Sequence, residues 1–529
     1  MGQAAVDAFR RSLLGASALS ALSALTAAGC APAPGSWSSQ WLGAAHERGH
    51  FLRNKPSGSL PPPSVQRRAQ VLVVGAGVAG LSAARVLRQR GGVDVQVLEL
   101  EGAAGGNSRG HVMGGLPCPL GAHYLPLPSA SAREVNEWLF ELGLLRHELG
   151  RTVPSEDHLC HSPQERLFID GAWAEGLLPP AEPASPTMAQ YRRFAALVAQ
   201  VQKIGFAMPS HRAPWTAAHA QLDAISFDAW LGESGLTDTR LRWYLDYCCR
   251  DDYGAGSAVV SAWAGLHYFA SRHGFHAPGD DAGEREPVFT WAQGNAWLTQ
   301  KLTAPLLGQL HTDRVVMQVT ESRHDVKVVA WNPVLQQVEA WTAQRVILAV
   351  PLFVAVRLLA SPPEALKQAV NHLSYAPWLV ANLALERPLL ARPGAPPSWD
   401  NVPYASAGLG YVDATHQSLR PDRLATLLTS YQTLATGQRG TLLNDSAQAW
   451  ALRVINDLSS VHPDLPAQVR QVDLMRYGHA MVIPTLGTRG HAALAALRAL
   501  RGRVRYAHSD LAGYSVFEEA FTAGVEAAS

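Results

Sequence analysis

The stretch VLVVGAGVAGLSAARVLRQRGGVDVQVLELE, residues 71–101, decides the fold. Its apolar run at 71–74 predicts a strand, a glycine-rich turn follows, and residues 81–87 have helical spacing. Gly75 serves the turn, Gly77 lets a pyrophosphate approach the backbone, and Gly80 lets the helix pack closely on the strand. Phosphates would lie at the helix N-terminus, where free N–H groups and the dipole favour negative charge. The predicted cofactor-binding residues of this turn are Gly75, Gly77, Ala79 and Gly80.

A second apolar run, residues 95–98, leads into Glu99, about twenty residues after the turn. A carboxylate at this place can accept hydrogen bonds from the ribose of an adenosine. A glycine turn alone could be structural and bind nothing. Strand, turn, helix, strand and acid in this order instead favour a dinucleotide site with Glu99 on the ribose.

The next residues, GAAGGNSRGH at 102–111, place Gly105 and Gly106 where a second loop can approach the phosphates closely. The run VLELEGAAGGNSRG resembles the adenosine-side motif of the superfamily of flavin-containing amine oxidases, protoporphyrinogen oxidases and phytoene desaturases. The resemblance implies that the ligand is FAD. It adds Asn107 and Ser108 to the predicted cofactor-binding residues.

Three later segments resemble the same superfamily in chain order. PLGAHYL, 119–125, resembles the segment that passes close to the flavin, which implies contacts from Gly121 and Ala122. RVVMQVTE, 314–321, resembles the strand whose backbone pairs with the adenine at Val316. The C-terminal run VRYAHSDLAGYSVFEEAFTAGVEAA resembles the last FAD motif. It implies that Asp510 lies near the ribityl or pyrophosphate, and that a helix from about Ser515 and Val516 points its N-terminus at the flavin.

The sequence departs from the amine oxidase pattern at three places, one of which is AHSD in the last motif, where Ala-Gly-Glu is usual. Asn107 stands where amine oxidases usually have arginine, so Arg109 would have to supply the cation near the phosphates. Val356 and Arg357 stand where many of them place a lysine near the flavin N5. Flavin binding is unaffected by these departures, whereas amine oxidation has to be supported by other residues.

The predicted fold class is α/β, with two domains: a Rossmann-like FAD/NAD(P)-binding domain and an interleaved α+β substrate domain. The FAD-binding domain is expected from three separate parts of the chain, and the substrate domain from a mainly helical part and a mixed-sheet part. The expected boundaries are an export signal at 1–30, a flexible tether at 31–68, FAD-binding parts at 69–130, 285–360 and 490–529, and substrate parts at 131–284 and 361–489.

Candidate catalytic residues come from stretches where aromatic and polar groups gather without helical or strand period. His123 and Tyr124 belong to the segment 119–125, which by its resemblance should lie at the flavin's front face, and Tyr477, His479 and Tyr514 are further candidates. YLDYCCRDDYGAG, 244–256, allows two interpretations: a substrate-facing loop whose carboxylates hold a cation, or a helix end with a solvated charge cluster. The second is slightly favoured, because charged loop residues are common on surfaces.

Composition excludes some classes of function. The chain is 47% hydrophobic and 16% charged with a net charge of +1, which gives no basic footprint for nucleic acid. Its five cysteines include no C-x-x-C pair, and its histidines have no partner cluster at ligand spacing, so no metal site is predicted.

The sequence therefore predicts an FAD-dependent oxidoreductase acting on a small molecule, most simply an amine that transfers hydride to flavin N5. A flavin-dependent desaturase or isomerase of an apolar substrate, and a non-catalytic flavin-binding envelope protein, are the alternatives. Oligomeric state is not predictable from the sequence.

The N-terminal run FRRSLLGASALSALSALTAAGC, 9–30, resembles a bacterial twin-arginine signal joined to a lipoprotein cleavage box. Arg10 and Arg11 supply the pair, and the box ends at Cys30. We expect a chain exported folded to the periplasmic side of the membrane and attached there through a lipid on Cys30. An uncleaved membrane anchor is the alternative, since the uncharged run is just long enough to span a bilayer.

Overall fold

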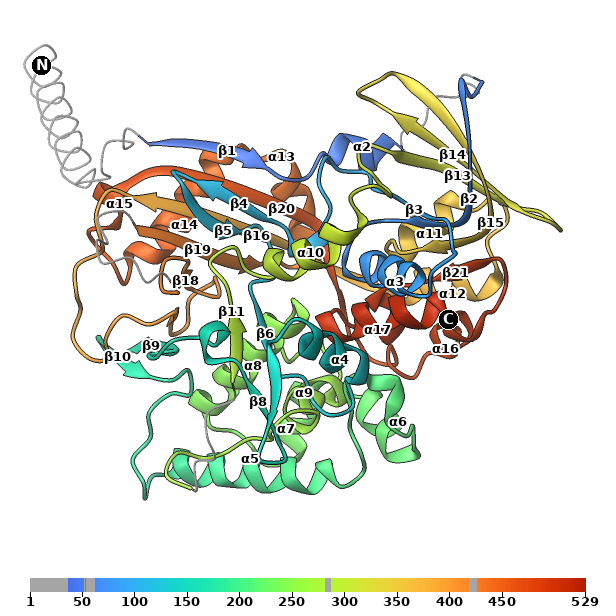
Figure 1. Ribbon diagram of the computed structural model, residues 1–529. Helices are drawn as coiled ribbons and strands as arrows, with labels where there is room; N and C mark the ends of the chain where they lie inside the picture. Colours follow the sequence, from blue (N-terminus) through green and yellow to red (C-terminus); the bar gives the residue numbers. More distant parts are fainter. Residues whose placement is uncertain (1–36, 52, 54–61, 281–286, 418–425) are drawn as a thin grey trace, which may run out of the picture.

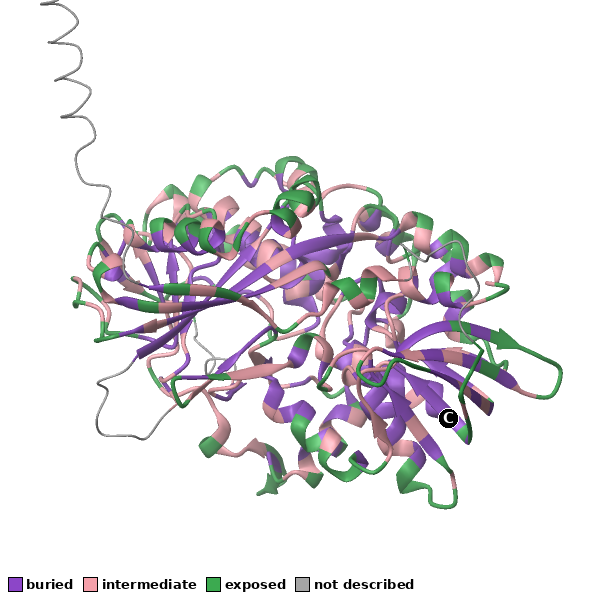
Figure 2. Cartoon of the chain, turned by 90° about the horizontal axis from the view of Figure 1, so that it is seen from above, coloured by how far each residue is buried: buried purple, intermediate pink, exposed green. Residues whose placement is uncertain are grey.

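The computed structural model describes residues 37–51, 53, 62–280, 287–417 and 426–529. The predicted export signal lies outside these described residues. Two large sheets, each with its own layer of helices, make up the molecule (Figure 1). Buried residues follow the strands of both sheets, whereas exposed residues gather on the outer helices and loops (Figure 2). The predicted α/β class, with a dinucleotide-binding domain and an interleaved α+β domain, is confirmed.

The dinucleotide-binding domain is a seven-stranded sheet that the chain enters and leaves several times. Its strands are ordered β12-β3-β2-β15-β14-β13, and β21 also pairs with β15. The β12, β3, β2, β15 and β21 pairings are parallel, and β13-β14-β15 is an antiparallel meander. The strands are β2 (Val65–Val74), β3 (Val95–Leu98), β12 (Leu310–His311), β13 (Val315–Glu321), β14 (Val326–Asn332), β15 (Gln337–Leu348) and β21 (Val504–Tyr506).

Helices α3 (Val78–Gln89) and α17 (Phe517–Ala528) cross on one face of this sheet, although they lie at opposite ends of the chain (Figure 1). A Cβ on Gly524 would lie 2.1 Å from the carbonyl oxygen of Ala79, so only glycine allows this crossing. The other helices on and around this domain are α4 (Arg133–Glu141), α10 (Ala296–Thr303), α11 (Leu352–Leu358), α12 (Glu364–His372) and α16 (Ala492–Ala499).

The second domain is built on an eight-stranded sheet ordered β1-β20-β16-β19-β18-β17-β9-β10. Its strands are β1 (Ser38–Leu42), β9 (Glu165–Ile169), β10 (Ala172–Glu175), β16 (Ser374–Leu385), β17 (Asp400–Pro403), β18 (Tyr411–Asp413), β19 (Thr426–Thr433) and β20 (Val469–Ile483). Its helices are α5 (Pro186–Gln202), α6 (Ala217–Asp223), α7 (Phe227–Glu233), α8 (Thr239–Tyr253), α9 (Ala262–Ala270), α13 (Arg439–Asn444), α14 (Ala447–Ser459) and α15 (Leu465–Gln468).

Several short elements lie outside the two large sheets. They are α2 (His46–Phe51) and the strand pairs β4 (Gly110–Met113) with β5 (Leu116–Pro119), β6 (Tyr124–Pro126) with β11 (Val288–Thr290), and β7 (Leu145–Glu148) with β8 (Arg151–Pro154). In the described residues no helix is both long and apolar enough to cross a membrane.

Three predicted boundaries differ from the structure. Residues 38–51, predicted as part of a flexible tether, form β1 and α2, because β1 finds a parallel partner in β20. The first strand of the dinucleotide-binding sheet begins at Val65, not at residue 69. Helices α4 and α12 were predicted within the substrate domain, but their apolar faces pack in the cores of the dinucleotide-binding domain.

Candidate active site

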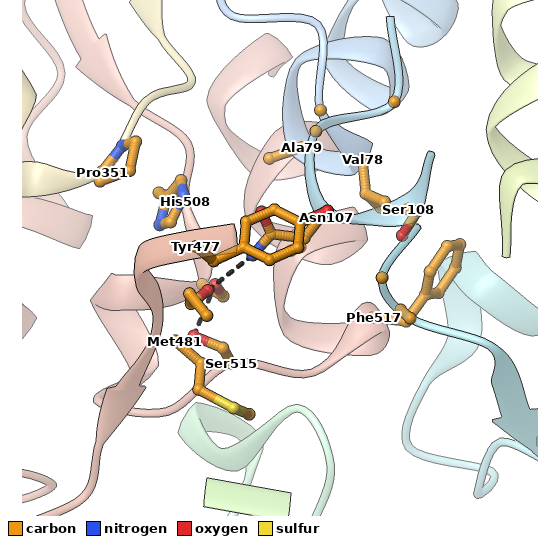
Figure 3. A pocket seen from close by; sticks show the side chains of 18 of the residues that line it. Val78, Ala79, Asn107, Ser108, Pro351, Tyr477, Met481, His508, Ser515 and Phe517 are labelled. Carbon is orange, nitrogen blue, oxygen red and sulfur yellow. Dashed lines mark hydrogen bonds between the residues drawn. The ribbon is translucent and has the colours of Figure 1, made fainter. Parts of the chain in front are cut away.

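A cavity of about 550 Å³ lies between the two domains. Its walls come from the turn before α3, the loops at 105–109 and 121–126, strand β20, and the segment that leads into α17. Figure 3 shows how Asn107, Tyr477, Ser515 and Phe517 surround it from elements far apart in the sequence. Such a cavity at the edge of a parallel sheet is where α/β proteins usually bind ligands.

The glycine turn at one end of the cavity leaves space only for backbone. Gly75 has a φ of +101°, and a Cβ there would lie 2.4 Å from the carbonyl oxygen of Ala349. A Cβ on Gly80 would lie 1.9 Å from the carbonyl oxygen of Gly75, so α3 can pack this closely on the turn only because residue 80 is glycine. Helix α3 begins after Gly77 without a side-chain cap. Its first N–H groups therefore remain available to an anion.

Glu99 stands beside this turn and is 8% exposed. Its Oε2 accepts a hydrogen bond from the N–H of Ala76 at 2.7 Å, and its Oε1 accepts one from Glu101 at 2.9 Å. Burial raises the pKa of the Glu99 carboxyl, which these two hydrogen bonds oppose. Because a carboxylate has about four acceptor positions, Glu99 can hold the turn and still accept from ribose hydroxyls.

A second helix N-terminus opens on the far side of the cavity. Helix α17 begins after Val516 without a side-chain cap, and Ser515, Val516 and Phe517 line the wall. Two buried polar atoms on the cavity wall, Asn295 Oδ1 and Trp378 Nε1, have no hydrogen-bond partner among the described residues. Two uncapped helix ends and unpartnered polar atoms fit a long, doubly charged ligand with a polar ring system, as FAD is.

The wall opposite the glycine turn is aromatic. The His123 ring stacks on Tyr431 with centroids 4.3 Å apart and an interplanar angle of 22°. Burial lowers the pKa of His123 to about 3, so the imidazole is neutral at pH 7. Tyr124 contacts the His123 ring edge-on and donates from its hydroxyl to Asp251 Oδ2 at 3.1 Å. The aromatic rings of this wall can contact an apolar substrate chain, and the Tyr124 hydroxyl orients the Asp251 carboxylate.

Carboxylates gather at the same end. Asp251 and Asp252, on the last turn of α8, and Glu518, on the first turn of α17, all line the cavity. Arg272 is the one arginine there among the described lining residues, and its Nη1 donates to Asp252 Oδ2 at 3.1 Å. Burial, helped by the neighbouring Asp252, raises the pKa of Asp251 to about 7, and burial raises that of Glu518 to about 7. The cluster can therefore accept either a cation or a proton.

The structure brings nearly all predicted site residues to this one cavity. Those that line it are Gly75, Gly77, Ala79, Glu99, Gly105, Gly106, Asn107, Ser108, Gly121, Ala122, His123, Tyr124, Val316, Tyr477, His479, Asp510, Ser515 and Val516. Gly80 packs α3 behind the turn and does not line the cavity. The carboxylate of Asp510 is directed to the wall, where it accepts from Leu352 N at 2.8 Å and Tyr375 Oη at 2.6 Å.

Tyr514 was predicted as a catalytic candidate, and the structure places it elsewhere. Its side chain is 1% exposed and does not line the cavity. Its hydroxyl donates to Glu519 Oε1 at 2.8 Å and lies 2.9 Å from His267 Nε2. The reason is that the turn before α17 directs Tyr514 into the core beneath the helix, so it supports α17 without reaching the cavity.

The interpretation of 244–256 as a helix end with a solvated charge cluster is confirmed for the helix end but not for the two aspartates. Helix α8 does end there, with Gly254 in the left-handed conformation, and Arg250 pairs with Asp246. The two carboxylates after Arg250 line the cavity, however, and Asp252 is buried. Sequence reasoning also missed Glu518, Arg272 and Tyr431, because nothing local indicated that three distant segments converge.

No group of three or more His, Cys, Asp or Glu side chains in the described part of the chain is arranged to hold a metal ion.

A family model for flavin containing amine oxidoreductases matches residues 78–529, so the chain belongs to that family. Its cofactor is FAD, and the chain is an FAD-dependent oxidoreductase. The residues that line the cavity fit this cofactor, as the uncapped helix ends and the glycine turn show.

Solved structures show the same fold. A structure of putrescine oxidase, described as wild type bound to putrescine, is 17% identical with a TM-score of 0.64 and covers 88% of this chain and 98% of that one. Cyclohexylamine oxidase from Brevibacterium oxydans IH-35A is 15% identical, with a TM-score of 0.63 and coverage of 87% and 98%. A CLA-producing fatty acid isomerase from P. acnes is 14% identical, with a TM-score of 0.57 and coverage of 86% and 97%. A search of curated proteins finds no match.

Proposed function

We propose that the protein oxidises a small cationic amine. The observation that supports this most strongly is the charge of the substrate end of the cavity, where three carboxylates face a single guanidinium. Among the described lining residues there is no lysine. Because Arg272 is already paired with Asp252, a carboxylate substrate would meet net negative charge, whereas an ammonium would find a partner.

The chain's own residues would bind and orient the amine. The hydroxyl of Tyr124 fixes Asp251, whose carboxylate would accept hydrogen bonds from the ammonium group. The stacked His123 and Tyr431 rings would contact the alkyl part and exclude water from it. A carboxylate with a raised pKa can also take the proton that the ammonium releases before oxidation.

When bound, FAD would supply the two-electron acceptor for the hydride that leaves the C–H bond beside nitrogen while the nitrogen lone pair forms C=N, and dioxygen or another acceptor would then take the electrons. Hydrolysis of the released imine by water would give an aldehyde or ketone and ammonia or a smaller amine.

Product assays test the proposal against its main alternative. We expect primary and secondary alkylamines to yield a carbonyl product in air, with hydrogen peroxide if dioxygen is the acceptor. Polyunsaturated fatty acids should give no conjugated diene absorbance, although one structural relative is a fatty acid isomerase. Diene formation without carbonyl product would overturn the amine assignment, and flavin that no donor reduces would favour the non-catalytic alternative.

Binding of a cation should depend on pH through Asp251. The titratable and charged groups that interact with its carboxyl are Tyr124, Asp252, Arg250, Arg272, Asp400, Tyr247 and Tyr431. With a pKa of about 7, Asp251 is mostly neutral below that pH, so affinity for a cation should fall as the pH decreases through 7. Glu518 also has a pKa of about 7, and its protonation would add to the loss of cation affinity below pH 7.

Tetramethylammonium is a suitable probe, because its charge does not titrate and it has no nitrogen lone pair to form an imine. Its dissociation constant, measured by calorimetry, should rise by up to about tenfold per pH unit below 7 for each carboxyl that must lose a proton. tert-Butanol, similar in size and uncharged, should show no such dependence. A flat profile for tetramethylammonium from pH 5.5 to 8 would refute the role of these carboxyls.

We also propose that the protein is exported folded and held on the periplasmic side of the membrane through a lipid on Cys30. The arginine pair and the cysteine box support this, as does the cofactor site. FAD would be enclosed by segments from residue 75 to residue 518, so a chain that acquires it in the cytoplasm has to fold there. Export of a protein that is already folded is what a twin-arginine signal implies.

Fractionation tests the export proposal. Changing Arg10→Lys and Arg11→Lys together should leave the flavoprotein in the cytoplasm, and Cys30→Ser should move it from the membrane to a soluble fraction. Unchanged fractionation of the arginine variant would contradict the export route, and unchanged fractionation of the cysteine variant would contradict lipid attachment.

A further inference from the structure

Residues 37–51 lie outside the family match, which begins at residue 78, yet they reach the FAD cavity. They comprise β1 and α2, and Ala44 between these elements lines the cavity wall. We propose that this segment, here called the strap, is a further part of the cofactor-binding site that holds Arg109 toward the FAD pyrophosphate and slows release of FAD.

One end of the strap is attached to the substrate domain. Strand β1 pairs in parallel with β20 over five residues, from Ser38 opposite Gln471 to Leu42 opposite Met475. The guanidinium of Arg476 lies over the Trp41 ring, with the carbon 4.5 Å from the ring centroid. The start of the strap is therefore ordered by the sheet that forms one cavity wall.

The other end is attached to the dinucleotide-binding domain. The N–H of Ala45 lies 3.1 Å from each carboxylate oxygen of Glu101, two residues beyond Glu99. Arg48 donates from Nη1 to the carbonyl oxygen of Leu100 at 3.1 Å and to Asp313 Oδ1 at 2.6 Å. These partners follow β3 and precede β13, the strands from which Glu99 and Val316 enter the cavity. The strap thus joins the two domains beside the adenosine end.

Between these attachments the strap contacts Arg109. The carbonyl oxygen of Gly43 accepts from Arg109 Nη1 at 3.0 Å, and the carbonyl oxygen of Gly106 accepts from Nε at 3.1 Å. Arg109 also lines the cavity. It is directed along the Gly105-Gly106 loop, where its charge complements a pyrophosphate, while Asn107 is occupied with the carbonyl oxygen of Ala480. Without Gly43, this arginine would lose its contact with the strap and keep those with the Gly106 carbonyl oxygen and the Tyr477 hydroxyl.

The packing around residue 43 leaves no space for a side chain. Its φ is +85°, and a Cβ would lie 2.4 Å from Met475 Sδ. The chain can therefore bend from β1 into α2 at this residue only because it has no side chain. The bend is what presents the carbonyl oxygen to Arg109.

Release of FAD from the holoenzyme tests the proposal. The variants are a deletion of 37–51 and the single change Arg48→Ala, which removes the hydrogen bonds of Arg48 to Leu100 and Asp313. Arg470→Ala is the matched control, because Arg470 pairs with Glu386 at the surface and is not on the cavity wall. Free FAD is followed by its fluorescence after dilution, which needs no substrate.

We expect FAD to leave the deletion variant at least about tenfold faster and Arg48→Ala several-fold faster, because lost contacts act mainly on dissociation. The control should release FAD at the rate of the unchanged protein. Release within twofold of that rate from both variants would overturn the proposal. If the deletion variant does not fold, Arg48→Ala decides, and its far-UV circular dichroism shows whether the fold persists.

This outcome is independent of the substrate. A strap that slows FAD release is compatible with any oxidation chemistry in the cavity, and failure of every amine as substrate would leave the result unaffected.

Discussion

Changing Asp251→Asn is expected to reduce kcat/KM for alkylamines by about 10- to 100-fold, the usual effect of losing a hydrogen bond to a charged group. The side chain keeps its size, and its amide oxygen can still accept from the Tyr124 hydroxyl. What is lost is the negative charge that would face the ammonium group. The visible spectrum and content of bound FAD should not change, because Asp251 belongs to the substrate end of the cavity.

Measuring the stability of the Asp251→Asn variant distinguishes loss of the substrate contact from general destabilisation of the fold. Burial raises the pKa of Asp251 to about 7, so the folded state resists its ionisation, whereas the unfolded chain ionises it near pH 4. The contribution of this group to stability therefore falls as the pH rises from about 4 to about 7 and stays low above that. At pH 8 the variant should be as stable as the unchanged protein or more so. The control Asp170→Asn, at an exposed residue paired with Arg240, should keep full activity.

A fall in kcat/KM of less than twofold would contradict this role for Asp251. A large fall accompanied by loss of FAD would show that the residue supports the cavity as a whole.

Changing Gly80→Ala is expected to weaken FAD binding strongly. The new methyl group would lie 1.9 Å from the carbonyl oxygen of Gly75 and 3.1 Å from the Ala349 Cβ, and the first of these contacts is with backbone. Helix α3 would have to move away from the turn whose N–H groups face the phosphates. Overpacking of this kind costs about 3 kcal/mol, and the same loss in binding corresponds to roughly 100-fold weaker affinity for FAD.

Gly232→Ala is the matched control for this change. Gly232 is also a helical glycine, in α7, and a Cβ there meets no atom within 4 Å. Alanine should stabilise that helix by up to about 1 kcal/mol. The FAD content after gel filtration and the melting temperature are the readouts. A Gly80→Ala protein that keeps both at the level of the unchanged chain would contradict the steric account of the turn.

The dinucleotide-binding half was predictable because its chemistry is local. The strand, the glycine turn at 75–80 and the helix follow one another directly in the sequence, and each glycine has a steric role in the turn. Local sequence therefore predicts the geometry of this part of the site. The same holds for Glu99, which follows its strand directly. Family resemblance then related Val316 and Asp510 to the turn, and both line the cavity.

The substrate end was less predictable because it depends on contacts between distant segments. Asp251 belongs to a charged helix end, which is solvated in many proteins and here meets Tyr124 from 127 residues away. Tyr514 lies next to cavity residues in sequence, but the turn before α17 directs it into the core. The strap has the composition of a linker, and it is ordered by pairing with β20 and by hydrogen bonds to Glu101, Leu100 and Asp313, all distant in sequence.

Amine oxidation is tested most directly by the absorbance of the purified holoprotein mixed anaerobically with a panel of polyamines and alkylamines. We expect the flavin bands to bleach with at least one amine and to return when air or an artificial electron acceptor is admitted. Flavin bands that persist with every amine would contradict amine oxidation, and a colourless protein that binds no added FAD would contradict the cofactor site itself.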